Sequence, residues 1–311
     1  MITLNTDRGF VTIETWDDIE SRVGFVKSLN PAEHRLADVI GSYQFKQQIP
    51  CGLSNCRQLH AKGYIAVTNQ GLETNLGKDC GRKHFGIDFV SMMKRHDRQV
   101  AEQQYRERLW AFVSKVDAVD ARIAELRRLG ADQVHKNVRL FQGVNRGCPD
   151  VVRRQIADMV EARSNILSLQ REATADEIDA IETREGRRVP RPHYIDTRVA
   201  EVAGLEALYP ENDLRQLLAM DLAANLETFR KLEIATLLHK ELKRWTNWCS
   251  SVEETLETVQ RIIGLGGQFL TLSNLRPFNQ LLQKREEQVA FGNFLKVAVA
   301  RQATTRATFS A

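Results

Sequence analysis

The sequence lacks the features that mark several protein classes. Its 311 residues include only five cysteines, seven prolines and 7% aromatic residues. Five unevenly spaced cysteines are too few for a disulfide-stabilised scaffold, and no apolar run approaches the roughly 20 residues of a membrane-spanning helix. The first residues lack the basic patch and apolar core of a secretory signal. These absences favour a cytoplasmic protein that does not cross a membrane.

What is present indicates a globular chain with one unusual segment. Apolar residues make up 42% of the sequence and charged residues 27%, which excludes wholesale disorder. The formal net charge is +4, and residues 51–100 carry all of this excess, with eight Lys and Arg against four Asp and Glu. Three of the five cysteines lie in the same segment. A local basic excess favours a local anionic partner over general polyanion binding.

The N-terminal part predicts short, mixed secondary structure. Residues 2–14 are β-rich around a turn and predict a hairpin. A capping box at Thr15 predicts a helix to about Leu29, and Asn30-Pro31 predicts a second helix towards Tyr43. Further along, residues 64–76 predict two strands around a glycine-containing turn.

The central part predicts a long helical hairpin. Nothing between Phe85 and Leu129 breaks a helical pattern, and the later part has apolar residues at the alternating steps of a coiled-coil seam. The seam residues are Tyr105, Leu109, Phe112, Val116, Val119, Ile123 and Leu126. A weaker stripe over 150–172 predicts a second helix that folds back on residues 105–129.

The C-terminal part predicts more helices. Thr174 and Glu177 form a capping box for a helix ending at Gly186, and a basic, proline-containing stretch follows. Further helices are expected over 197–208, 211–247, 252–263 and 277–299. The glycines at 264–267 favour a helix stop, and Trp245 and Trp248 favour core anchors over base-stacking groups.

These patterns predict a mainly α fold with a small α/β zinc-binding N-terminal module, a long helical hairpin and a C-terminal helical domain. The expected organisation is a hairpin with two helices over 1–49, the zinc-binding module over 50–95, a coiled-coil-like helical hairpin over 96–186, a basic linker over 187–196, a helical domain over 197–300 and a flexible tail over 301–311.

The chemistry is concentrated in a cysteine pattern. Cys51 and Cys56 have four residues between them, and Cys80 and His84 follow one helical turn apart at the expected start of the long helix. Three cysteines and one histidine form a standard closed ligand set for zinc. A short two-stranded unit has little core of its own, so a metal is a plausible source of its stability. We therefore expect Zn²⁺ on Cys51, Cys56, Cys80 and His84.

This segment resembles a treble-clef zinc finger over about residues 50–95. That group joins a cysteine knuckle to a β-hairpin and takes two more ligands from the first turn of a helix, here Cys80 and His84. A typical knuckle has two residues between its cysteines and this one has four, so His60 is a reserve ligand.

Two alternatives concern the chemistry of the cysteines. If Cys51 did not bind, a zinc-bound water could occupy the open position, with Glu73 or Asp79 as base. Four good ligands leave no such position, so we expect no catalysis. Cys148 and Cys249 have no partner spacing and are expected to be free thiols, buried or partly buried.

Two functions compete. In the first, the protein associates with nucleic acid through basic residues of the zinc module. These residues are Arg82, Lys83, Lys94, Arg95 and Arg98. In the second, zinc is purely structural, and the seam at 105–126 binds a protein partner or a second copy, as in a scaffold subunit of a bacterial or phage assembly. The charge excess on the metal module favours the first.

Overall fold

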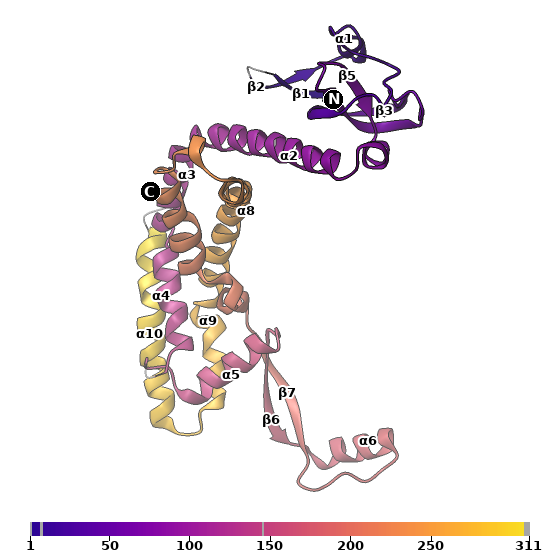
Figure 1. The fold of residues 1–311 in the computed structure, drawn as a ribbon. Coiled ribbons are helices and arrows are strands. Elements are labelled where there is room, and N and C mark those ends of the chain that lie inside the picture. Colours follow the sequence, from indigo (N-terminus) through magenta and orange to yellow (C-terminus); the bar gives the residue numbers. More distant parts are fainter. Residues whose placement is uncertain (1, 7–8, 145, 308–311) are drawn as a thin grey trace. The chain divides into compact units, whose positions relative to one another are not determined.

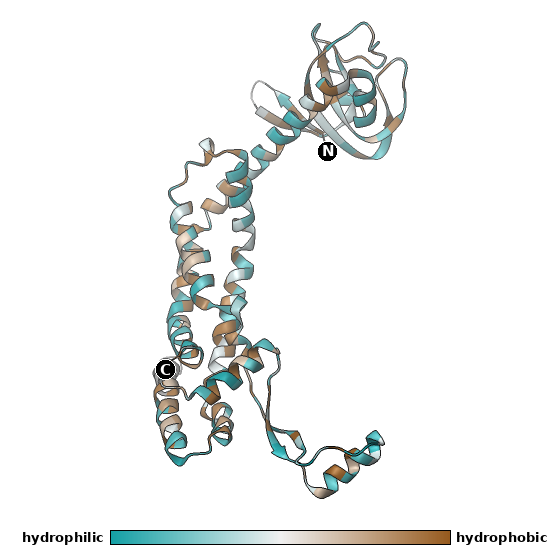
Figure 2. Cartoon of the chain, turned by 60° about the horizontal axis from the view of Figure 1, so that its bottom comes forward, coloured by the Kyte–Doolittle hydropathy of each residue, from teal (hydrophilic) through white to brown (hydrophobic). Residues whose placement is uncertain are grey.

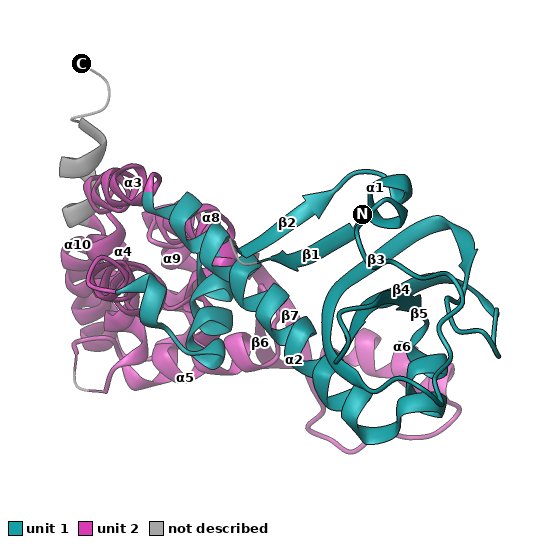
Figure 3. Cartoon of the chain, turned by 45° about the horizontal axis from the view of Figure 1, so that its top comes forward, with its two compact units in different colours: residues 1–113, 233–249 teal, residues 114–232, 250–311 magenta. Residues whose placement is uncertain are grey.

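The computed structural model describes residues 2–6, 9–144 and 146–307 (Figure 1). The fold is mainly α, with a small sheet near the N-terminus, as the sequence predicts. The chain divides into two compact units, coloured separately in Figure 3. Unit 1 comprises residues 1–113 and 233–249, and unit 2 comprises residues 114–232 and 250–311.

Unit 1 is built on a five-stranded antiparallel sheet with the strand order β2-β1-β3-β4-β5. The strands are β1 (Ile2–Thr6), β2 (Gly9–Ile13), β3 (Leu36–Pro50), β4 (Leu59–Thr68) and β5 (Glu73–Leu76). Both predicted hairpins, over 2–14 and over 64–76, are confirmed. Strand β3 is long enough to pair with β1 on one side and β4 on the other.

The predicted helix from Asn30 to Tyr43 is wrong, because most of that segment is β3. Val39, Gly41 and Tyr43 are buried at alternate positions, the period of a strand. Asn30 does accept a hydrogen bond from Ala32 N at 3.1 Å, but this closes a local turn and no helix follows.

The helix predicted from Thr15 to Leu29 is much shorter than expected. Thr15 caps α1 (Trp16–Glu20), its hydroxyl accepting from Asp18 N, and the helix ends at Glu20. The chain beyond it forms turns and bends with isolated bridges at Phe25 and Leu29, and Val26 N donates to the carbonyl of Glu73 in β5 at 2.8 Å.

Helix α2 (Lys78–Val113) follows the sheet and covers part of it. Gly86 has φ 60° and ψ −139°, so the helix is interrupted there. It ends at Val113, and α3 (Val116–Arg128) begins a separate helix in unit 2. The unbroken helix predicted over 85–129 is therefore wrong, and the predicted seam is divided between the two units.

The seam residues are nevertheless buried inside the chain, except for Tyr105, which is half-buried. In unit 1, Phe112 contacts Trp248 edge-on with 5.5 Å between ring centroids, and Trp248 contacts Trp245 in the same way. The interpretation of the two tryptophans as core anchors is supported by this packing, since Trp245 is buried. The cation of Arg244 lies over the outer face of the Trp245 ring.

Unit 2 packs helices against one another, with hydrophobic and hydrophilic residues alternating along them (Figure 2). Helix α4 (Ala131–Gln142) contacts α3, α5 (Asp150–Glu161) and α10 (Arg285–Ala307). The expected hairpin of 105–129 with a helix over 150–172 is wrong, because α5 ends at Glu161 and residues 166–172 form a strand. That strand, β6 (Ile166–Glu172), pairs with β7 (Tyr194–Glu201).

The β6–β7 ribbon leads to α6 (Ala175–Glu185), which lies at the end of the ribbon away from the other helices of unit 2 in Figure 1. Both hydrogen bonds of the predicted capping box are present between Thr174 and Glu177, and the helix ends at Gly186, so this prediction is confirmed. Residues 187–193 are irregular as expected and connect α6 to β7 within unit 2.

The remaining elements differ from the predicted C-terminal helices. They are the 3₁₀ turns η1 (Leu205–Leu208), η2 (Pro210–Asn212), η4 (Ile234–Thr236) and η5 (Arg276–Leu281), the π-helix η3 (Arg215–Ala224), and the helices α7 (Asn225–Phe229), α8 (His239–Phe269) and α9 (Leu272–Leu275). The helix predicted over 197–208 is wrong, since β7 and η1 occupy it. The helix predicted over 211–247 is divided into several short elements.

The helix stop predicted at residues 264–267 is also wrong, because α8 continues through it to Phe269. A Cβ on Gly266 would lie 2.2 Å from Cγ1 of Val134 in α4. The glycine therefore permits close packing of α8 on α4 and does not end the helix. Of the predicted tail over 301–311, residues 301–307 continue α10, and 308–311 lie outside the described residues.

None of the helices in the described part of the chain combines the length and hydrophobicity that crossing a bilayer requires.

One buried group of unit 1, the imidazole of His96, leads us to expect a stability that depends on pH. His96 of α2 is only 1% exposed, contacts Phe10 of β2 edge-on, and has no hydrogen-bond partner for either ring nitrogen among the described residues. Burial lowers the pKa of His96, and this effect exceeds that of the negative charges of Asp97 and Asp38, which raise the pKa. The folded state therefore disfavours the protonated ring.

As the pH falls below about 6.5, the unfolded chain binds a proton that the folded chain excludes, so stability decreases. Between about pH 7 and about pH 5, the free energy of unfolding should decrease less in His96→Phe than in the wild type. The difference should be up to about 1.4 kcal/mol for each unit by which the pKa of His96 differs between the folded and unfolded states. Urea unfolding of both proteins at the two pH values measures this. Equal losses in the two proteins would show that His96 does not contribute.

Candidate metal centre

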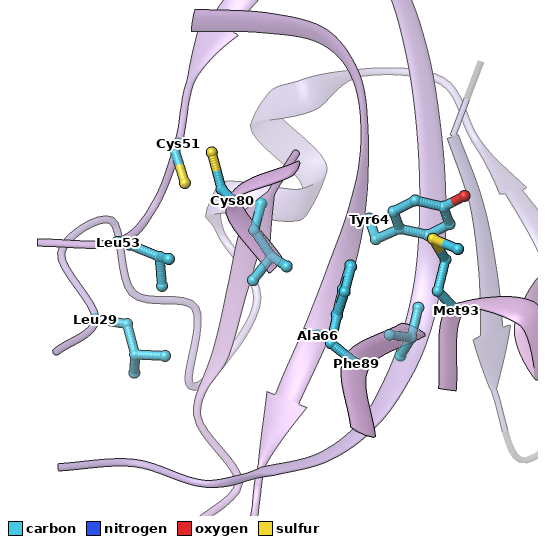
Figure 4. Close-up of a cluster of buried hydrophobic side chains, with 10 residues drawn as sticks. Leu29, Cys51, Leu53, Tyr64, Ala66, Cys80, Phe89 and Met93 are labelled. Carbon is cyan, nitrogen blue, oxygen red and sulfur yellow. The ribbon is translucent and has the colours of Figure 1, made fainter. Parts of the chain in front are cut away.

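Three thiols of unit 1 meet at one end of the buried cluster that joins the sheet to α2. The sulfur atoms of Cys51, Cys56 and Cys80 all lie within 4.8 Å of one another, and those of Cys56 and Cys80 are 3.3 Å apart. Figure 4 shows Cys51 and Cys80 next to each other beside Leu53. A tetrahedral zinc with Zn–S bonds of about 2.3 Å has sulfur atoms about 3.8 Å apart. The three thiols can therefore hold a metal ion.

Each cysteine is positioned by a different part of the chain. Cys51 follows β3, Cys56 lies in the connection between β3 and β4, and Cys80 lies in the first turn of α2. The backbone shapes the connection: Cys51 N donates to the carbonyl of Gln58 at 2.9 Å, and Cys56 N to that of Leu53 at 3.2 Å. The two predicted positions, a loop before the β4–β5 hairpin and a helix start, are confirmed.

The thiols affect one another's ionisation. Burial, together with the neighbouring thiol of Cys56, raises the pKa of Cys80 to about 12, and burial also raises the pKa of Cys51. Partial burial opposes ionisation of Cys56, but hydrogen bonds from the Gln58 backbone and the other two thiols, with the charge of Lys83, lower its pKa. Cys56 is thus the first to ionise. A bound dication would supply the positive charge that the other two thiolates need.

Neither candidate histidine is part of the thiol cluster. His84 lies one turn after Cys80 on α2 and is half-buried. His60 is held elsewhere: Nδ1 donates to the carbonyl of Gln58 at 3.1 Å, so Nε2 accepts from the Tyr43 hydroxyl at 2.5 Å. Burial lowers the pKa of His60, consistent with a neutral ring in this position. With both ring nitrogens occupied, His60 is a structural residue of the β3–β4 pair.

The sequence pattern did not identify the polar residues around the sulfur atoms. The Cys80 thiol donates to Oε1 of Gln58 at 3.7 Å, and the Cys51 thiol donates to the carbonyl of Asn75 at 3.9 Å. Asn75 also donates from its side chain to the carbonyl of Pro50 at 2.9 Å, fixing the end of β3 against β5. Gln58 and Asn75 lie in strands or loops that pair only in the folded chain, so no spacing in the sequence marks them.

The two residues considered as a catalytic base are occupied. Glu73 is buried and bonded through both carboxylate oxygens to Arg22, at 2.7 and 2.8 Å. Asp79 is exposed and lies 3.6 Å from the guanidinium of Arg82. Cys148 is a buried free thiol and Cys249 a half-buried one, as expected, and burial raises the pKa of each to about 12.

The five predicted nucleic-acid contacts are all exposed on α2. Three of them are paired with carboxylates: Arg95 with Asp38 of β3 at 2.7 Å, Arg98 with Glu102 at 2.9 Å, and Arg82 with Asp79. In the described part of the chain, Lys83 and Lys94 have no ion-pair partner. Arg82 and Lys83 lie near the start of α2, next to Cys80, whereas Lys94, Arg95 and Arg98 lie further along the helix, beyond the interruption at Gly86.

Comparison of the chain with protein-family models, curated proteins and solved structures gives no match. The functional conclusion below therefore rests on the geometry of the chain itself.

Proposed function

We propose that the protein binds zinc through Cys51, Cys56, Cys80 and His84, and that this module associates with nucleic acid through the exposed cations of α2, Arg82, Lys83, Lys94, Arg95 and Arg98. The observation that supports zinc is the meeting of three soft sulfur ligands from three separate segments. Residues four apart on a helix lie on one face, so a change in the side-chain torsions of His84 would bring its ring towards the sulfur of Cys80.

The order of the elements supports the resemblance to a treble clef. A loop with two ligands, a β-hairpin formed by β4 and β5, and a helix with the third ligand in its first turn follow one another along the chain. In this arrangement a metal would join the end of β3, the β3–β4 connection and the start of α2. The bound metal would supply cross-linking between these three segments.

The exposed cations of α2 support association with nucleic acid. Exposed ion pairs such as Arg95–Asp38 and Arg98–Glu102 contribute only about 0–1 kcal/mol, so a phosphate can replace the carboxylate. Lys83 and Lys94 are available without such an exchange. Phosphate contacts of this kind give affinity with little sequence preference.

The scaffold alternative has less support. Leu109, Val119 and Leu126 of the predicted seam are buried within the chain, so the seam offers no open apolar face to a partner helix.

Binding to labelled single- and double-stranded DNA and RNA across a salt series tests the nucleic-acid proposal. We expect the variant Lys94→Gln/Arg95→Gln/Arg98→Gln to bind at least about tenfold more weakly, with a log–log salt slope shallower by about 0.7–0.9 per lost cation. The matched control is Lys115→Gln/Arg127→Gln/Arg128→Gln, which removes the same charge from exposed positions at α3.

No binding by the wild type at low salt would refute the proposal. Equal weakening in the control would do the same, because it would assign the binding to overall charge and not to α2.

A further inference from the structure

A second basic site lies in unit 2 and is formed by residues other than those of the metal centre. A cleft of about 870 Å³ opens between α4 and the start of the π-helix η3. Four cationic side chains line it, Lys136, Arg139, Arg146 and Arg215, against a single carboxylate, that of Asp213. Such an excess of one sign in a concave site concentrates anions.

Asp213 organises the cleft. Its carboxylate accepts from the backbone N of Arg215 at 2.9 Å, and it pairs with the guanidinium of Arg139 and, at 3.3 Å, with Nδ1 of His135. Burial opposes ionisation, but the hydrogen bond from Arg215 N and the charge of Arg139 lower the pKa of Asp213. The carboxylate therefore remains charged and holds Arg139 at the wall of the cleft.

The other three cations are not neutralised in this way. In the part of the chain that the structure describes, Lys136, Arg146 and Arg215 have no ion-pair partner, and all three are exposed. Arg146 is packed over the end of α4, since a Cβ on Gly143 would lie 2.5 Å from its Cδ. The aliphatic part of the Arg146 side chain is thus packed against the end of α4, and Arg146 lines the cleft.

We propose that this cleft binds the phosphate groups of a phosphorylated ligand. Guanidinium groups bond phosphate oxygens in pairs, and the cleft presents three of them. Its volume falls in the range of small-molecule sites, about 300–1,000 Å³. A π-helix at its rim is a further sign, because π-helical turns concentrate at functional sites.

The lining indicates which part of such a ligand is recognised. Among the described residues no Phe, Tyr or Trp ring lines the cleft, and its one imidazole, that of His135, is paired with Asp213, so the lining favours phosphate contacts over base stacking. Two sources present this chemistry: a small polyphosphate such as that of a nucleotide, and the backbone of a polynucleotide. This site goes beyond the function proposed for α2, since it lies in the other unit and uses different residues.

The test uses full-length, zinc-loaded protein. Titration calorimetry with inorganic tripolyphosphate and fluorescence anisotropy with a short labelled single-stranded DNA are measured for the wild type and for Arg146→Gln/Arg215→Gln. We expect tripolyphosphate affinity to fall at least about tenfold in the variant, because two charge-assisted contacts are lost. The matched control, Arg127→Gln/Arg128→Gln, should bind as the wild type does.

The two sources give different results. If the cleft accepts a polynucleotide backbone, tripolyphosphate competes with the DNA, and the variant loses DNA affinity by a similar factor. If it accepts a small phosphorylated molecule, DNA affinity is unchanged and only tripolyphosphate binding is lost.

Absence of tripolyphosphate binding to the wild type, or equal loss in the control, would overturn the proposal. Because the α2 variant is measured separately, failure of either site is distinguishable from failure of the other.

Discussion

Replacing Cys80 with serine is expected to abolish stoichiometric zinc binding and to destabilise unit 1. Of the three clustered thiols only that of Cys80 belongs to α2, so its loss would leave His84 as the one proposed ligand from this helix. Structural zinc contributes its binding free energy to folding, which makes the loss of a ligand one of the large single-residue effects. We expect a decrease of at least about 3 kcal/mol in the free energy of unfolding.

Zinc analysis of the purified protein and urea unfolding measure the two effects. The wild type should carry about one equivalent of zinc and Cys80→Ser less than about half an equivalent. Cys249→Ser is the matched control, because it removes a half-buried thiol outside the cluster. It should keep the zinc and lose little stability.

A protein that is isolated without zinc and whose stability is the same with serine at position 80 would contradict the metal centre. Packing of three free cysteines would then account for the cluster, since cysteine packs well as a small apolar side chain.

The cluster of thiols was predictable because local rules place each cysteine. A glycine-rich stretch forces a turn, a β-rich pair forms a hairpin, and Cys80 lies at the first turn of a helix. Each of these features depends on neighbours within a few residues. What local spacing does not give is the orientation of His84, which depends on side-chain torsion and on the metal itself.

The helix predicted over 30–43 does not form, because contacts from outside the segment outweigh its local preference. Asn30-Pro31 is a good helix start, but Val39, Gly41 and Tyr43 are buried at alternate positions of a strand that pairs with β1 and β4. Pairing on both edges of a strand outweighs a local preference, because propensity is worth less than about 1 kcal/mol per residue. The residues of the predicted helix do not themselves reveal those two partners, since β4 follows β3 after the connection 51–58 and β1 lies near the start of the chain.

The division of the predicted central helix into α2 and α3 could not be predicted from the sequence for a related reason. The step pattern from Tyr105 to Leu126 is regular, and nothing in it marks the break after Val113. Different partners cover the apolar residues on the two sides of the break. Before the break Phe112 packs against Trp248, and after it α3 packs against α4. A continuous apolar stripe shows that a face is buried and does not identify what buries it.

Replacing Gly81, which directly follows Cys80, with alanine is expected to cause the second large loss of stability. Gly81 is buried, and a Cβ there would lie 2.3 Å from Cε1 and 2.4 Å from Cζ of Phe89. Phe89 is fully buried and contacts Tyr64 edge-on at 5.9 Å, so its ring has little room to move. Gly81→Ala should therefore cost about 2 kcal/mol, although alanine favours the helix by about 1 kcal/mol over glycine.

The cost of Gly81→Ala should depend on the ring of Phe89. A double-mutant cycle that combines Gly81→Ala with Phe89→Leu measures this dependence. Leucine lacks the two ring atoms closest to the added methyl group, so Phe89→Leu removes most of the overlap while keeping an apolar core residue. In the background of Phe89→Leu, the cost of Gly81→Ala should fall by at least about 1 kcal/mol. Additive effects of the two changes would show that Gly81 is required for another reason.

Zinc retention separates packing from ligand geometry in the same set of proteins. Displacement of Phe89 by Gly81→Ala also shifts the backbone next to Cys80, so the single variant should release zinc to a chelator faster than the wild type. The double variant, with the overlap relieved, should return towards the wild-type rate. If stability recovers in the double variant but zinc release does not, the glycine acts on the metal centre through the backbone of Cys80, independently of Phe89.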